Sequence, residues 1–205
     1  MNNCKELPQA LLEDAQQKWA AFKKSAESAN TPVSRDPIIV SSMRRVFAFS
    51  DFVAESCIRD PSLLHDLIQS GDLQRHYSPD DFVQPLVRKL KGLCQEDELK
   101  RILRKFRRRE MVRIAWRDLD GRADLAQTVA DLSSLADACL EQTYRLLFQW
   151  QCEKFGTPTA ADGSAQNLVI LGLGKLGCRD CAQLQPLVQE LHIIGVLAHL
   201  SLDGE

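Results

Sequence analysis

Glycine and aromatic residues are scarce in this chain, and long apolar runs are missing from it. Only 10 of the 205 residues are glycine and 6% are aromatic, which favours a helical protein over a β-sandwich or barrel. No stretch has the length of a signal-peptide core or a membrane span, so we expect no membrane partner. The net charge is only −2, so we expect no nucleic-acid partner either. These absences predict a cytoplasmic globular protein.

The cysteines do not indicate a disulfide framework. There are seven, an odd number, and most are scattered through helical patterns. Thiols stay reduced in the cytoplasm, where a free cysteine behaves as a small apolar side chain. We therefore expect the cysteines to be packed rather than paired.

Apolar spacing and helix-stop residues predict an almost entirely helical chain as far as residue 155. Prolines and glycines fall between the apolar stripes, where they separate one helix from the next. Serine and aspartate precede several stripes and can accept hydrogen bonds from the free amides of a first turn. Helices are expected at 6–29, 38–59 with a break near Ser50, 60–71, 78–92, 95–119 and 124–154.

Residues 95–119 form the most highly charged of these helices. Acidic residues cluster at its start and basic residues follow, as the helix macrodipole favours. The bases could form a solvated face with internal ion pairs, such as Glu110 with Arg107 or Arg113. Their arginine density, with aromatic residues interleaved, equally fits docking against an acidic surface. The candidate docking residues are Arg104, Arg107, Arg108, Arg109, Arg113 and Arg117.

A short apolar run and a glycine-spaced turn follow the helices, at Leu168–Gly177. The run is typical of a buried strand, and glycines just past a strand let the backbone approach a phosphate closely. A lysine in the turn adds positive charge. The candidate nucleotide-binding residues are Gly172, Gly174, Lys175 and Gly177. The expected fold is therefore mainly α, a helical bundle followed by a short α/β segment.

Two other interpretations of this region stay open. The three glycines match the dinucleotide-binding fingerprint, although that fold needs further crossover units and Pro186 would interrupt the helix after the turn. Cys178 and Cys181, with His192 and His199, offer four side chains of the kinds that bind zinc. Their spacing departs from that of a zinc finger.

Four stretches stand out as extended motifs: Phe49–Asp60, Leu103–Leu119, Asp131–Cys139 and Leu168–Gly177. In this order they resemble successive blocks of the bacterial glutamine synthetase adenylyltransferase family. The resemblance covers residues from about 40 to 177 and rests on several long motifs. It implies the N-terminal, adenylyl-removing half of a bifunctional enzyme built from two nucleotidyltransferase-type domains.

The resemblance implies a function in nitrogen assimilation. In the family, one half strips AMP from a tyrosine of glutamine synthetase by phosphorolysis, and the other attaches AMP from ATP. Glutamine and the signalling protein PII decide which activity dominates. The implied partners are thus glutamine synthetase and PII, and the implied cofactors are Mg²⁺ and ATP or ADP. Aspartates on a sheet hold the metal, and the glycine turn receives the phosphate oxygens.

The sequence departs from the family pattern just after the glycine turn. The family continues with a further glycine, then Arg-Glu-Leu-Asn-Phe-Ser-Ser and an Asp-x-Asp pair. Here Cys178 replaces that glycine, and residues 181–188 occupy the place of the serines and metal-binding aspartates. No Asp-x-Asp occurs beyond Asp180, so no metal ligand and no catalytic residue can be assigned. We expect this chain to be inactive and to bind neither cofactor productively.

The expected organisation has three parts. Residues 1–35 form an N-terminal helix and linker, 36–158 a helical bundle, and 164–205 a truncated nucleotidyltransferase start with a divergent tail. The alternative function is a helical binding module that docks glutamine synthetase or PII without catalysis.

A frameshift would explain the divergent tail. Codons for Leu-Asn-Phe-Ser, read one base out of register, can spell Gln-Leu-Gln, which stands at Gln183–Gln185. We expect another frame of the coding DNA, downstream of the codon for Gly177, to encode the missing serines and the Asp-x-Asp pair. Sequencing that DNA checks this, and a gene with no such frame would contradict it.

Overall fold

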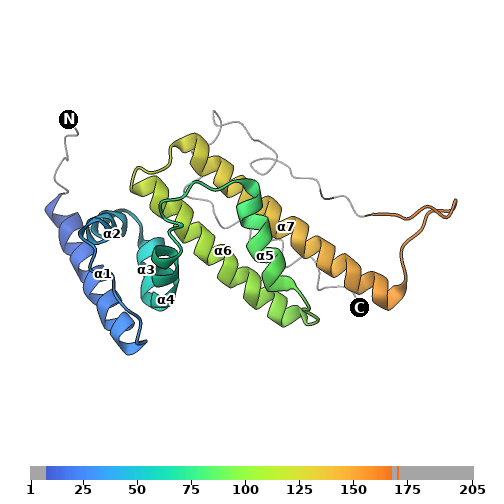
Figure 1. Ribbon diagram of the computed structural model, residues 1–205, viewed down its shortest axis with the longest axis horizontal. Coiled ribbons are helices and arrows are strands. Elements are labelled where there is room, and N and C mark those ends of the chain that lie inside the picture. Colours follow the sequence, from blue (N-terminus) through green and yellow to red (C-terminus); the bar gives the residue numbers. More distant parts are fainter. Residues whose placement is uncertain (1–7, 168–169, 171–205) are drawn as a thin grey trace. The chain divides into compact units, whose positions relative to one another are not determined.

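The computed structural model describes residues 8–167 and Ile170. The chain divides into two units, residues 1–167 and 168–205, and every helix of the described residues lies in the first (Figure 1). The predicted mainly α fold is confirmed. The predicted strand and glycine turn at 168–177 lie outside the described residues. The helices are α1 (Gln9–Ser28), α2 (Pro37–Phe49), α3 (Asp51–Arg59), α4 (Pro61–Gln69), α5 (Pro79–Leu90), α6 (Glu96–Leu119) and α7 (Leu125–Phe155).

Local capping residues fix where several helices begin and end. The Ser50 side chain accepts a hydrogen bond from the Val53 amide at 3.2 Å, which separates α3 from α2. Ser78 and Asp81 form a reciprocal capping box at the start of α5. Gly71 lies just past α4 with a φ of 73°, a left-handed conformation that glycine adopts without steric strain. The predicted boundaries therefore agree with the observed ones to within a few residues.

The long helix α6 takes part in two separate hydrophobic cores. Its C-terminal half contributes Val112 and Trp116 to a core that it shares with α1, α2, α3 and α4. Leu99 and Phe106 of its N-terminal half, together with Met111 and Ile114 farther along, belong to a second core with α5 and α7. Figure 1 shows α6 and α7 running side by side in opposite directions, with α5 along them and α1–α4 grouped at the C-terminal end of α6.

Trp116 joins α6 to the first core. Its indole Nε1 donates to the Ser42 hydroxyl at 2.8 Å, and its ring meets Phe47 edge-on with centroids 6.5 Å apart. Phe47 in turn meets Phe22 of α1 edge-on at 6.0 Å. The predicted N-terminal segment therefore packs into the same core as α2–α4, and the boundary between the two units follows Asn167.

No helix of the described residues is long and apolar enough to cross a bilayer.

Burial should decide how much a leucine contributes to stability. Leu67 in the first core is fully buried, whereas Leu125 at the start of α7 is 57% exposed. We expect Leu67→Ala to lower the free energy of unfolding by about 2–5 kcal/mol, because it leaves a cavity. The same change at Leu125 should lower it by about 0.5 kcal/mol or less. Urea denaturation followed by circular dichroism measures both, and equal losses would contradict the assigned core.

Candidate functional site

The arginines of α6 separate into an enclosed group and an exposed group. Arg113 and Arg117 are buried, with 0% and 3% of their surface exposed, and Arg109 is largely covered. Arg104 is exposed, and Arg107 and Arg108 are partly exposed. The six predicted docking residues thus do not share one surface.

Arg113 is a charged side chain that is fully enclosed in the protein. Its Nε donates to Glu110 Oε2 at 2.9 Å, and its Nη2 donates to Asp131 Oδ2 of α7 at 2.8 Å. The guanidinium also lies over the ring of Tyr77, 3.6 Å from the centroid, and within 5.1 Å of the Phe82 ring. A buried cation is tolerated only with such partners, so Arg113 ties α6 to α7 and to the segment before α5.

Arg109 continues this network towards α4. Its guanidinium donates to Asp66 Oδ2 at 2.6 Å, to Asp72 Oδ2 at 2.7 Å and to Glu110 Oε1 at 2.6 Å. Glu110 therefore bridges Arg109 and Arg113 through its two carboxylate oxygens. The pKa of Arg109 is raised: burial alone would lower it, but Glu110 and the other carboxylates outweigh that effect.

The segment between α4 and α5 supplies the remaining partners. Burial alone would raise the pKa of Asp72, but hydrogen bonds from Arg109, Ser70 and Tyr77 outweigh it and hold that pKa below its usual value. Burial, together with the nearby charge of Glu110, raises the pKa of Tyr77 to about 12. At neutral pH the phenol is therefore neutral and Asp72 is ionised, which is the charge state that the network requires.

Arg117 has no carboxylate partner among the described residues. It donates to backbone carbonyls instead, to Leu73 O at 3.5 Å and to Arg122 O at 3.2 Å. Burial, followed by repulsion from Arg113, lowers its pKa. Arg117 thus holds the connections before α5 and after α6 in place. A partner cannot reach Arg113 or Arg117 in this fold, because both serve internal contacts.

The surface-facing bases of α6 form a short run from Arg104 to Arg108. None of its four basic side chains forms an ion pair with a carboxylate within the part of the chain that the structure describes. The run includes Lys105, which the sequence-based set of docking residues omitted because it contained only arginines. The signal for Lys105 was its place in the middle of the basic stretch. The run consists of Arg104, Lys105, Arg107 and Arg108.

Within residues 8–167 and at Ile170, no group of three or more histidine, cysteine or acidic side chains is arranged to hold a metal ion. The predicted nucleotide-binding residues and the alternative zinc ligands lie outside that part of the chain. They are Gly172, Gly174, Lys175 and Gly177 for the nucleotide, and Cys178, Cys181, His192 and His199 for zinc.

Comparison with known proteins assigns the family. A profile of the family described as glutamate-ammonia ligase adenylyltransferase matches residues 40–182, which is more than half of the chain. The chain belongs to this adenylyltransferase family. The match includes most of α2, all of α3–α7 and the predicted glycine turn, and it ends five residues beyond Gly177.

Curated members of the family carry the name bifunctional glutamine synthetase adenylyltransferase/adenylyl-removing enzyme. The protein from Nitrosococcus oceani is 41% identical over 179 residues, covering 87% of this chain and 18% of its own length. That from Pseudomonas aeruginosa is 48% identical over 135 residues, covering 65% and 14%. That from Shewanella loihica is 36% identical over 182 residues, covering 88% and 19%. The chain thus spans less than a fifth of the length of these relatives.

Removing Arg113 should destabilise the fold by leaving acidic groups buried without a partner. We expect Arg113→Leu to lower the free energy of unfolding by about 3–5 kcal/mol. Pairing it with Asp131→Leu should restore part of that loss, because the orphaned carboxylate is removed as well.

Urea denaturation of both single variants and the double variant gives the coupling free energy between the two positions. Arg108→Leu on the exposed side of the same helix is the matched control, with an expected change within about 0.5 kcal/mol. Strictly additive effects of Arg113→Leu and Asp131→Leu would contradict the assigned pair.

Proposed function

We propose that this chain is the helical scaffold of an enzyme that regulates glutamine synthetase by transferring AMP to a tyrosine or removing it by phosphorolysis. The observation that carries this is the family match over residues 40–182, which takes in the arginine helix and the predicted glycine turn together. The names of the relatives include both activities and the target enzyme. In such an enzyme, the buried network on α6 would keep the helical unit rigid.

The residues of this chain do not fit the magnesium that the resemblance implies for the family. No group of three candidate ligands in the described residues is arranged to hold a metal ion, and residues 178–205 contain no Asp-x-Asp pair. The glycine turn with Lys175 could still receive phosphate oxygens through backbone amides and the lysine charge. We therefore assign a phosphate-binding role to Gly172, Gly174, Lys175 and Gly177, and no catalytic residue.

A second candidate function is a helical binding module that docks glutamine synthetase or PII without chemistry. The specific observation in its favour is the run of exposed and partly exposed bases on α6, which form no ion pair within the described residues, since charged groups of this kind commonly meet opposite charges on a partner. Association with glutamine synthetase in the absence of any AMP removal would favour this candidate over the first.

The polypeptide of 205 residues should not remove AMP from glutamine synthetase. We expect no ADP above background when it is mixed with adenylylated glutamine synthetase, Mg²⁺ and phosphate, because it lacks the carboxylate pair that would hold the metal. A full-length family enzyme from Pseudomonas aeruginosa serves as the positive control. ADP release by the polypeptide would show that its metal ligands lie elsewhere in the sequence.

A further inference from the structure

A stretch of five residues inside α6 carries four basic side chains, here called the basic patch: Arg104, Lys105, Arg107 and Arg108. The bases on either side of the patch have carboxylate partners. Lys100 pairs with Glu96 at 2.7 Å and Arg101 with Glu98 at 3.2 Å, and Arg109 contacts three carboxylates. The patch itself has no ion pair within the described part of the chain. Its positive charge is therefore available to pair with an anionic group outside the helical unit.

The patch also repels itself. Side chains three and four positions apart are neighbours on a helix, so Arg104 faces Arg107 and Arg108, and Lys105 faces Arg108. Like charges at these spacings destabilise a helix. The helix therefore gains nothing internally from this arrangement, whereas an anionic partner would relieve the repulsion.

The face of α6 that carries the patch packs against the first core farther along the helix. Continuing from Arg104 and Arg108 at helical spacing leads to Val112, Ala115 and Leu119. Val112 lies in the first core, and Ala115 and Leu119 pack against it, under the group α1–α4. One continuous face of α6 is thus covered towards its C-terminus, while farther back it carries the exposed Arg104 and the partly exposed Arg108.

The surroundings of the patch select the chemistry of its partner. Acidic residues 96–98 precede it, and Asp66, with a 60% exposed side chain, lies beside Arg109 at its other end. Glu96, Glu98 and Asp66 are paired with neighbouring bases, which confines the unpaired positive charge to the patch, and the net charge of −2 gives a nucleic acid or an anionic membrane no long-range attraction to the chain. Single carboxylates on a protein can fit at so small a patch, and arginine binds carboxylate in a two-pronged geometry.

We propose that the basic patch docks an acidic surface of a partner protein, and that Arg104 and Arg108 are its central contacts. Within the second candidate function, on which this inference rests, the partner is glutamine synthetase. Arg113 and Arg117 take no part, because they are enclosed.

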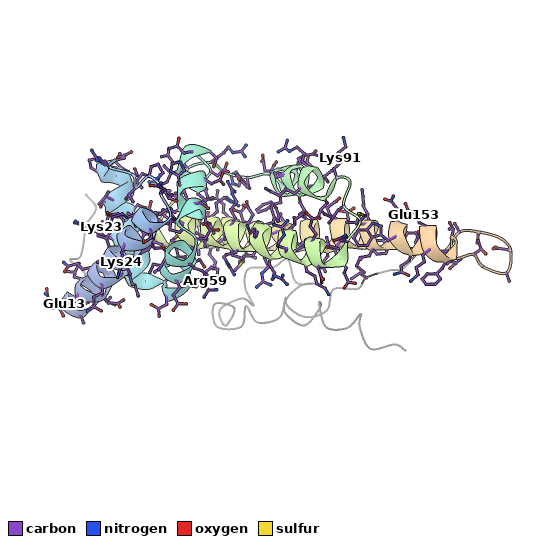
Figure 2. The ribbon with its side chains drawn as sticks, turned by 90° about the horizontal axis from the view of Figure 1, so that it is seen from below. Glu13, Lys23, Lys24, Arg59, Lys91 and Glu153 are labelled. Atoms are coloured by element: carbon purple, nitrogen blue, oxygen red, sulfur yellow. The ribbon has the colours of Figure 1, made fainter. Side chains whose placement is uncertain are left out.

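The test is the association of the 205-residue polypeptide with purified glutamine synthetase, measured by biolayer interferometry at low and high salt. The patch variant carries Arg104→Gln and Arg108→Gln. The matched control carries Lys24→Gln and Lys91→Gln, which remove the same charge from exposed positions on α1 and at the end of α5 (Figure 2). Circular dichroism melts establish that both variants fold like the parent.

The parent and the control should bind alike and lose affinity as salt rises. The patch variant should bind about tenfold more weakly and respond less to salt. Equal affinities of the patch and control variants would overturn the assignment, and so would a parent that does not bind glutamine synthetase. Patch-dependent binding to RNA or to anionic vesicles, but not to glutamine synthetase, would overturn the choice of a protein partner. Each of these outcomes is independent of the ADP-release assay, so failure of the docking surface and failure of the proposed enzymatic role can be told apart.

Discussion

The enclosed guanidinium of Arg113 is the constraint on which the helical unit depends. It is fully buried, and it contacts Glu110 within its own helix, Asp131 on α7 and the ring of Tyr77 before α5. An uncompensated charge in such a place would destabilise the fold strongly, so all three partners must be in position together. Three elements far apart in the sequence are thereby held in one arrangement. Apolar packing alone tolerates small sliding movements, whereas directed hydrogen bonds to a planar group do not.

Glu110 extends this constraint to α4. Its second oxygen accepts from Arg109, which also contacts Asp66 and Asp72, so the network reaches α4, a helix of the first core. The two hydrophobic cores are therefore connected both by the backbone of α6 and by a chain of charged side chains. Charged groups in the interior can specify one arrangement among several that would bury similar apolar area.

The sequence indicates the helices well and the orientation of α6 poorly. Caps such as Ser50 and the left-handed stop at Gly71 act within a few residues, so their effect can be recognised locally. Whether an arginine of α6 faces inward depends on Asp72 and Asp131, which lie 37 residues before Arg109 and 18 residues after Arg113. Arginines surround this helix, so periodicity could not separate Arg113 from Arg108. The internal pair of Glu110 and Arg113 was foreseeable from its spacing of three.

Because α6 contributes to two cores, the family should tolerate insertions and deletions at some positions and not at others. Each added or deleted residue within an α-helix turns everything beyond it by about 100°. Such a change between Phe106 and Met111 would turn the apolar side chains beyond it, which serve both cores, relative to Leu99 and Phe106, so α6 could not keep its contacts with both. Insertions should therefore accumulate in the connector between α1 and α2 and in the segment that follows α7, and the middle of α6 should keep a constant length.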